Sequence, residues 1–273
     1  PTPTRWNHMY FISLYEHEWE LTKSPGGANQ WVAKESEMLV PDAFDQSKKY
    51  KPTMLTTDLS LIRDSAYNVI SKRFYENPEE FDIAFAKAWF KLTHRDMGPK
   101  STYLGPEIPK EDFIWQDPIP ANPLEKINSS DISELKELIQ ATDLSNSSLI
   151  STAWASASTY RHSDRRGGSN GARIALLPQK NWECNNPVLL ENVLTEYDKI
   201  RTEFKSKTGK EISLADLIIL AGNVGVEEAA KKGGYSIQLA FTTGRTDATQ
   251  EITSVEGMTV LEPMADGFRN YKK

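Results

Sequence analysis

The sequence predicts a mostly α-helical fold, and three observations support this prediction. Apolar residues recur at three- and four-residue spacing over residues 58–74, the period of a helix that buries one face. A second pattern of this kind fills residues 77–92. Two long amphipathic stretches, 187–207 and 214–232, each run into a glycine that can end a helix. Strand patterns are few and short, and no internal repeat is visible.

The composition is that of a globular protein, because 38% of the 273 residues are hydrophobic and 26% are charged. A net charge of −6 and the lack of a long basic run argue against a nucleic-acid partner. No apolar run is long enough for a membrane span. The single cysteine, Cys184, excludes an internal disulfide and is typical of a reducing compartment, so we expect a cytoplasmic location. The chain opens on Pro1 without a methionine or a signal peptide, which favours a piece of a longer protein.

The first 53 residues are turn-rich, and we expect one short aromatic helix there, around residues 11–21. Asp58 stands where the N-cap of the next helix is expected. Asn77 and Pro78 restart a helix as cap and first residue, and Gly98-Pro99 ends it. We expect that helix to bury a set of apolar side chains, namely Phe81, Ala84, Phe85, Ala88, Trp89 and Leu92.

The middle of the chain changes composition at residues 117–131, where prolines give way to a run of Asn and Ser, as in linkers. Helices are expected to resume at 132–140 and 147–161. The Gly-rich stretch 165–171 follows. It lacks the lysine and spacing of a phosphate-binding loop, so we interpret it as a flexible turn.

Motifs for metal binding or nucleophilic catalysis are absent. The four histidines, His8, His17, His94 and His162, are scattered and lack the spacing of zinc motifs. No Gly-x-Ser-x-Gly turn occurs, and Cys184 has no histidine nearby in the sequence. The sequence therefore predicts no metal site.

Two charged residues each allow two interpretations. Asp58 can be a helix cap worth about 1 kcal/mol, or a carboxylate that orients a histidine whose other ring nitrogen binds a metal. Arg95 can be a cation at the negative end of a helix. It can also be a mobile, permanently charged guanidinium that meets an ionisable group in an active site.

Eight motifs spread along the chain carry a resemblance to a known family. They are Trp19–Pro25, Thr57–Leu61, His94–Pro99, Trp115–Pro118, Ser151–Ala157, Asp164–Gly168, Gly244–Ala248 and Leu261–Tyr271. Together they resemble catalase-peroxidases, the bifunctional haem enzymes of the class I peroxidase superfamily. The resemblance covers essentially the whole chain.

The resemblance implies a haem-peroxidase-like helical fold with parts of two tandem domains. Residues 1–122 would be the C-terminal portion of the haem-binding domain, 123–131 a linker, and 132–273 the first half of a haem-free domain. The cofactor would be haem b, whose histidine ligand is expected upstream of Pro1. The implied activity is breakdown of hydrogen peroxide and oxidation of small organic donors, in a homodimer.

The resemblance also assigns roles to individual residues. Asp58 matches the aspartate that hydrogen-bonds the proximal histidine and makes its imidazole more basic. Arg95 matches a mobile arginine that pairs with an ionised tyrosine. These two are the predicted catalytic residues, and Trp6 matches an aromatic near the haem edge that could relay an electron.

The second half departs from the peroxidase pattern. A working distal helix carries Arg-x-x-Trp-His, whereas Ser151 and Ala155 stand at the arginine and histidine positions here. We therefore expect no peroxide cleavage in this half, and we expect Trp154 and Tyr160 to be core residues. The alternative for the whole chain is a non-catalytic, haem-free helical scaffold or interaction module.

Overall fold

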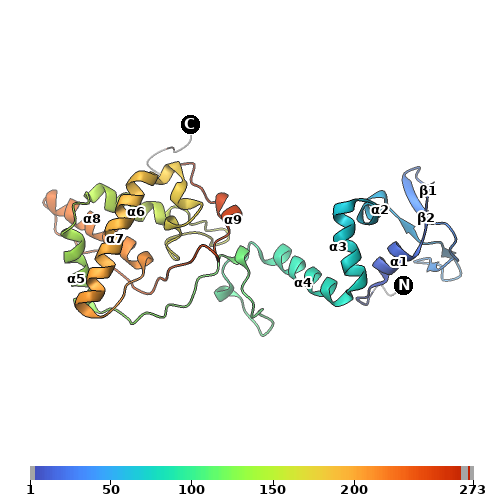
Figure 1. The fold of residues 1–273 in the computed structure, drawn as a ribbon, viewed down its shortest axis with the longest axis horizontal. Helices are drawn as coiled ribbons and strands as arrows, with labels where there is room; N and C mark the ends of the chain where they lie inside the picture. The colour runs from blue at the N-terminus through green and yellow to red at the C-terminus, as the bar shows by residue number, and fades with distance from the viewer. Residues whose placement is uncertain (1–3, 266–269, 271–273) are drawn as a thin grey trace. The chain divides into compact units, whose positions relative to one another are not determined.

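The computed structural model describes residues 4–265 and 270. The chain divides into two compact units, Pro1–Thr93 and His94–Lys273. Helices dominate both units (Figure 1), so the predicted mostly α fold is confirmed. Among the described residues, no helix has the length and apolar content that crossing a lipid bilayer requires. Part of the motif 261–271 lies outside the described residues.

The first unit begins with helix α1 (Met9–Glu16), followed by a small antiparallel sheet. Its strands are β1 (Trp19–Lys23), β2 (Asn29–Ala33) and β5 (Thr53–Met54) in that spatial order, and a second ribbon pairs β3 (Val40–Pro41) with β4 (Lys49–Tyr50). Leu21 lies opposite Trp31 in the register. The aromatic helix expected over residues 11–21 therefore ends at Glu16. Gly27, with φ of 83°, lies in the hairpin turn between β1 and β2, and its N–H donates to the Ser24 carbonyl.

The helix predicted over residues 58–74 is two helices, α2 (Thr56–Arg63) and α3 (Ser65–Glu76). Asp64 separates them, because its backbone is extended and its carboxylate accepts hydrogen bonds from the N–H groups of Ala66 and Tyr67 at 2.9 and 3.1 Å. A capping aspartate inside an apolar period starts a new helix without disturbing that period.

Helix α4 (Pro78–His94) begins with Pro78 as predicted, but the burial predicted for its apolar face is wrong. No residue of α4 is buried, and Trp89 and Leu92 are 58% and 73% exposed. Only Phe81 and Ala84 of the predicted set are partly covered. The amphipathic pattern is present, yet the other described residues of the first unit leave most of this face uncovered.

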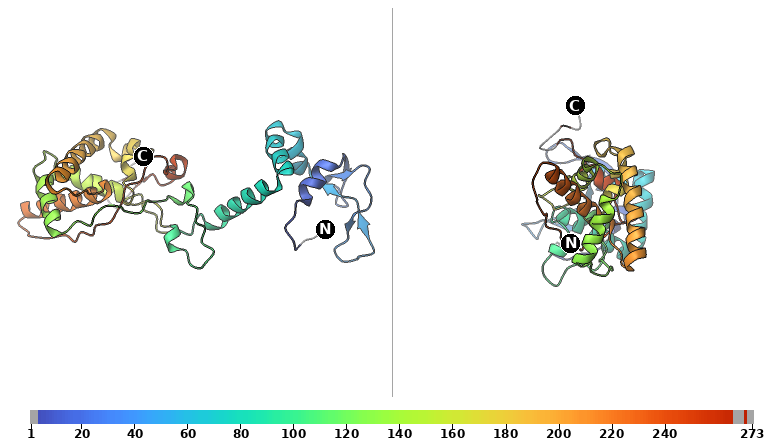
Figure 2. Two further views of the ribbon diagram at one scale, coloured as in Figure 1. Left: turned by 60° about the horizontal axis from the view of Figure 1, so that its bottom comes forward. Right: turned by 90° about the vertical axis from the view of Figure 1, so that its left-hand side faces the viewer.

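The second unit is a helical bundle of α5 (Ser129–Gln140), α6 (Asn146–Ala157), α7 (Pro187–Thr208) and α8 (Leu214–Lys232), followed by the short α9 (Val255–Thr259) (Figures 1 and 2). Short 3₁₀ turns are η1 (Lys100–Thr102), η2 (Ile114–Gln116), η3 (Arg173–Ala175), η4 (Gln179–Asn181) and η5 (Glu183–Asn185). Fully buried side chains from α5, α7 and α8 form the core. They include Leu135, Val193, Tyr197, Phe204, Leu217, Ile218 and Leu220.

Helices α6 and α8 approach closely at Gly222, where an added Cβ would lie 2.4 Å from Cβ of Ala153. This contact decides which face of α6 is buried. Trp154 lies off that face and is 43% exposed, and Tyr160, beyond the helix end, is 50% exposed. The prediction that these two aromatics are core residues is therefore wrong.

Helix α5 starts three residues earlier than predicted, because Asn128 caps it and the Asp131 carboxylate accepts a hydrogen bond from the Asn128 N–H. Ile127 is already part of the core. The compact units divide between Thr93 and His94. The family-based boundaries at residues 122 and 131 stay a prediction.

Candidate functional site

Asp58 is the third residue of α2, not its N-cap. Leu55 occupies the cap position in an extended conformation, and its N–H donates to Oδ2 of Asp58 at 2.7 Å. The sequence analysis misplaced the helix start, because Thr56 and Thr57 take the first two helical positions. Asp58 still satisfies one free backbone donor at the helix start, as the third residue of a capping box does.

The second oxygen of this carboxylate is held by a side chain distant in sequence. The phenol of Tyr10 donates to Oδ1 of Asp58 at 2.8 Å. Burial of the phenol, together with the hydrogen bond and charge of Asp58, raises the pKa of Tyr10 above its ordinary value of 10.0. Two donors thus fix the orientation of the Asp58 carboxylate, and the sequence analysis missed Tyr10.

Trp6 belongs to an aromatic row along α4. Its ring stacks on Phe81 with centroids 5.5 Å apart, and its Nε1 donates to Oδ1 of Asp82 at 2.5 Å. Phe85 and Trp89 continue the row, stacked at 6.3 Å. The four-residue spacing of the three α4 aromatics is the sequence signal that could have revealed this row.

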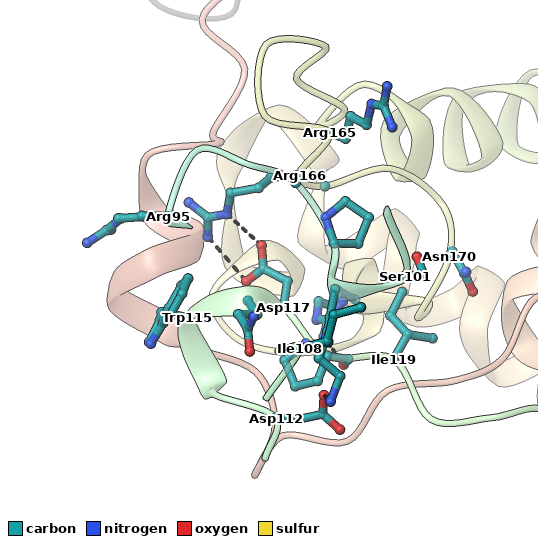
Figure 3. A pocket seen from close by; sticks show the side chains of 17 residues that line it. Arg95, Ser101, Ile108, Asp112, Trp115, Asp117, Ile119, Arg165, Arg166 and Asn170 are labelled. Carbon is teal, nitrogen blue, oxygen red and sulfur yellow. Dashed lines mark hydrogen bonds and ion pairs between the residues drawn. The ribbon is translucent and has the colours of Figure 1, made fainter. Parts of the chain in front are cut away.

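Arg95 follows directly after α4 and lies at the start of the second compact unit, next to its first residue, His94. It is exposed, and it lines a cavity of about 550 Å³. In Figure 3 the guanidinium of Arg95 is turned away from Arg166. Asp58 lies in the first compact unit and Arg95 in the second, so each residue is described within its own unit.

An ion pair between Arg166 and Asp117 lies in the wall of this cavity (Figure 3). Nε of Arg166 is 2.6 Å from Oδ2 of Asp117, and the two side chains are 7% and 8% exposed. Nη2 of Arg166 also donates to the Gly257 carbonyl at 3.0 Å. The pair joins two of the family motifs, 115–118 and 164–168, and the sequence analysis did not foresee it.

The stretch 165–171, interpreted above as a flexible turn, is packed against the end of α6. An added Cβ on Gly167, whose φ is 75°, would lie 2.2 Å from the Thr159 carbonyl oxygen. Only glycine fits there, and the close approach holds Arg166 in its buried position. The stretch 165–171 is a turn, as interpreted from the sequence, but it packs closely against the end of α6.

Metal-binding clusters of three His, Cys, Asp or Glu side chains are absent from the described part of the chain. None of the four histidines lines the Arg95 cavity. His8 shows a buried Nδ1 without a hydrogen-bond partner among the described residues, while its Nε2 lies 3.1 Å from the Tyr75 carbonyl.

Comparison with known proteins gives two concordant results. A family model described as peroxidase matches residues 83–269. The whole chain is 60% identical, over 274 aligned residues, to catalase-peroxidases of Burkholderia mallei strain SAVP1 and Burkholderia pseudomallei strain K96243. It spans 38% of the length of each of these relatives. Since the family model covers more than half of the chain, this protein belongs to the peroxidase family.

Proposed function

We propose that this chain is part of a bifunctional catalase-peroxidase, which decomposes hydrogen peroxide and oxidises small organic donors with it. One observation carries the proposal: 60% identity to catalase-peroxidases extends over the full chain. The eight motifs quoted above fall in both compact units, so the similarity is not confined to one segment.

The iron ligand of haem b is proposed to lie in protein upstream of Pro1, as the resemblance implies. The cavity beside Arg95 has no histidine in its wall, and its charged lining is mainly arginine. Haem, when bound, would supply the redox chemistry of peroxide cleavage.

Asp58 would act as a positioning residue toward the histidine ligand of that haem. Each carboxylate oxygen has two lone pairs. Oδ1 can therefore keep the Tyr10 phenol and still accept an imidazole N–H, which makes the imidazole a stronger electron donor. The two hydrogen bonds from Tyr10 and Leu55 support this role, because they fix the carboxylate before any partner binds.

Arg95 would be the pH-responsive residue of the same enzyme. Its guanidinium is exposed, and an arginine side chain carries a permanent positive charge in proteins. A phenolate of the haem domain is the partner that the resemblance supplies. Trp6 is the weaker candidate, an aromatic relay whose ring stacks on Phe81.

The domain organisation is proposed as residues 1–122, 123–131 and 132–273, with the last segment supporting the haem domain and a homodimer. The exposed apolar face of α4 supports an upstream partner segment, because a face with Trp89 and Leu92 uncovered is costly in water. Ser151 and Ala155 provide neither a cation nor a base for peroxide chemistry. The single cysteine supports a cytoplasmic location.

Hemin binding tests the proposal. The 273-residue chain and a longer protein that includes the upstream region are purified, mixed with hemin and assayed for a Soret band and for oxygen release from peroxide. We expect neither signal from the 273-residue chain and both from the longer protein. A Soret band with oxygen release from the short chain would contradict an upstream iron ligand. A longer protein without either signal would favour the alternative, a non-catalytic helical scaffold or interaction module.

A further inference from the structure

The cavity in the second compact unit carries an excess of positive charge. Its lining includes five cationic residues, Arg95, Lys100, Arg165, Arg166 and Arg173, and two carboxylates, Asp112 and Asp117. Both carboxylates are already engaged. Lys100 Nζ lies 2.5 Å from Oδ1 of Asp112, and Arg166 is paired with Asp117.

The excess of positive charge in the cavity is energetically most unfavourable at Arg173. The residue is 5% exposed, its Nε donates to Oγ1 of Thr253 at 3.2 Å, and its Nη2 donates to the Pro118 carbonyl at 2.8 Å. Both acceptors are neutral. Burial lowers the pKa of Arg173, the charge of Asp117 opposes that shift, and the charge of Arg166 adds to it. A buried cation with only neutral hydrogen-bond partners is unfavourable unless an anion compensates it.

The side chains around Arg173 can bind such an anion. The hydrogen bonds of Arg173 to described residues use Nε and Nη2 and leave Nη1 without one, and Arg173 is a residue of the cavity wall. Asn170 accepts from the Thr246 N–H through Oδ1, which leaves its amide NH₂ as a donor. Arg165 is exposed and is also a lining residue of this cavity, and in Figure 3 its guanidinium is turned away from the Arg166–Asp117 pair. Guanidinium groups bind carboxylate and phosphate oxygens with paired, charge-assisted hydrogen bonds.

The wall also has an apolar part, with Trp115, Ile108 and Ile119 among its side chains (Figure 3), beside the polar Ser101 and Gln116. The volume of about 550 Å³ is in the range of small-molecule pockets. We propose that this cavity is a binding site for a small oxyanion, a carboxylate or a phosphate, held by Arg173 and Arg165 with Asn170. This site involves no haem chemistry and does not depend on the function proposed above.

Calorimetric titration of the 273-residue chain tests the site with two probes, inorganic phosphate and benzoate. We expect saturable binding of at least one probe. Binding of benzoate alone would assign a ligand with an apolar body, and binding of phosphate alone a compact inorganic or phosphoryl group. Binding of neither probe would overturn the proposal.

Variants locate the site. Arg173→Gln should weaken binding by about tenfold or more, and Arg165→Gln by about threefold, since hydrogen bonds to charged groups are the strong ones. Arg165 is exposed, so its substitution keeps the test valid if Arg173→Gln does not fold, which far-ultraviolet circular dichroism would reveal. Arg5→Gln is the matched control, because Arg5 is exposed and lies outside the cavity wall. Equal binding by wild type, Arg165→Gln and Arg5→Gln would overturn the proposed site.

Discussion

The phenol of Tyr10 and the carboxylate of Asp58 form a hydrogen bond of 2.8 Å between α1 and α2. The two residues are 48 positions apart in the chain. The bond links the first helix of the unit to the carboxylate that we propose as a positioning residue.

Stability should fall in alkaline solution because of this bond. The pKa of Tyr10 is raised in the folded chain above 10.0, its ordinary value. The unfolded chain therefore loses the phenol proton first as pH rises, so the stabilisation is complete below about pH 10 and is lost progressively as the pH rises from there toward the folded-state pKa. Urea unfolding between about pH 8 and pH 11 measures this. Tyr10→Phe should lower the free energy of unfolding at neutral pH by about 0.5 kcal/mol, because the bond is partly exposed, and should weaken the alkaline loss. An identical pH dependence in wild type and Tyr10→Phe would contradict the prediction.

The Asp117–Arg166 pair should respond unequally to removal of either partner. Asp117→Asn removes the carboxylate that is paired with Arg166 and that offsets the buried charge of Arg173, whereas Arg166→Gln leaves Asp117 available to Arg173. Breaking a buried pair costs about 3–5 kcal/mol. We expect Asp117→Asn to lower the free energy of unfolding by an amount at the upper end of that range, and Arg166→Gln to lower it by less. Urea unfolding followed by tryptophan fluorescence measures both losses. The reverse order would show that Arg173 does not interact with Asp117.

Tyr197 offers a substitution that should not destabilise the protein. Its side chain is fully buried, and its hydroxyl has no hydrogen-bond partner among the described residues. Burying an unpaired hydroxyl costs about 1–3 kcal/mol, so Tyr197→Phe should leave the melting temperature unchanged or raise it. Phe204→Ala, at a fully buried neighbour in the core, is the control and should cost about 3–5 kcal/mol. A clear fall in melting temperature for Tyr197→Phe would reveal a partner for the hydroxyl.

Leu92 tests whether another segment covers α4. In the 273-residue chain Leu92→Lys should change the free energy of unfolding by less than about 0.5 kcal/mol, since the side chain is exposed. In the longer protein the same substitution should destabilise clearly if the upstream segment packs on this face. Leu220→Ala, in the core of the second unit, should cost about 2–5 kcal/mol in both proteins. If Leu92→Lys leaves the free energy of unfolding of both proteins unchanged, α4 no longer supports an upstream partner segment.

Arg95 tests the proposed pH-responsive role in the longer, haem-loaded protein. Arg95→Ala should lower oxygen release from peroxide by about tenfold or more, because a charge-assisted pair is lost. Donor oxidation should change much less. Arg95→Lys keeps the charge without the planar group and should be intermediate. Equal loss of both activities in Arg95→Ala would contradict the role.

The sequence by itself determined the helices whose ends are set by local chemistry. Ser213 caps α8 by accepting a hydrogen bond from the Asp216 N–H at 3.1 Å, and Gly209 ends α7 with φ of 74°, as the glycine after that stretch predicts. Helix caps and helical periodicity depend on residues only a few positions apart, so they can be recognised in a single sequence. The eight motifs gave the family for a related reason, since each is a short run of neighbouring residues.

The tertiary structure alone decided which surfaces are covered and which distant charges meet. Trp154 and Leu92 fit a buried helical face by spacing, yet both are exposed, because burial depends on what the rest of the chain places against that face. Arg166 sits in a Gly-rich run that is typical of a mobile turn, and it is buried because Asp117, 49 residues away, faces it. Contacts over such separations depend on how helices pack, and periodicity along one helix carries no information about its partner.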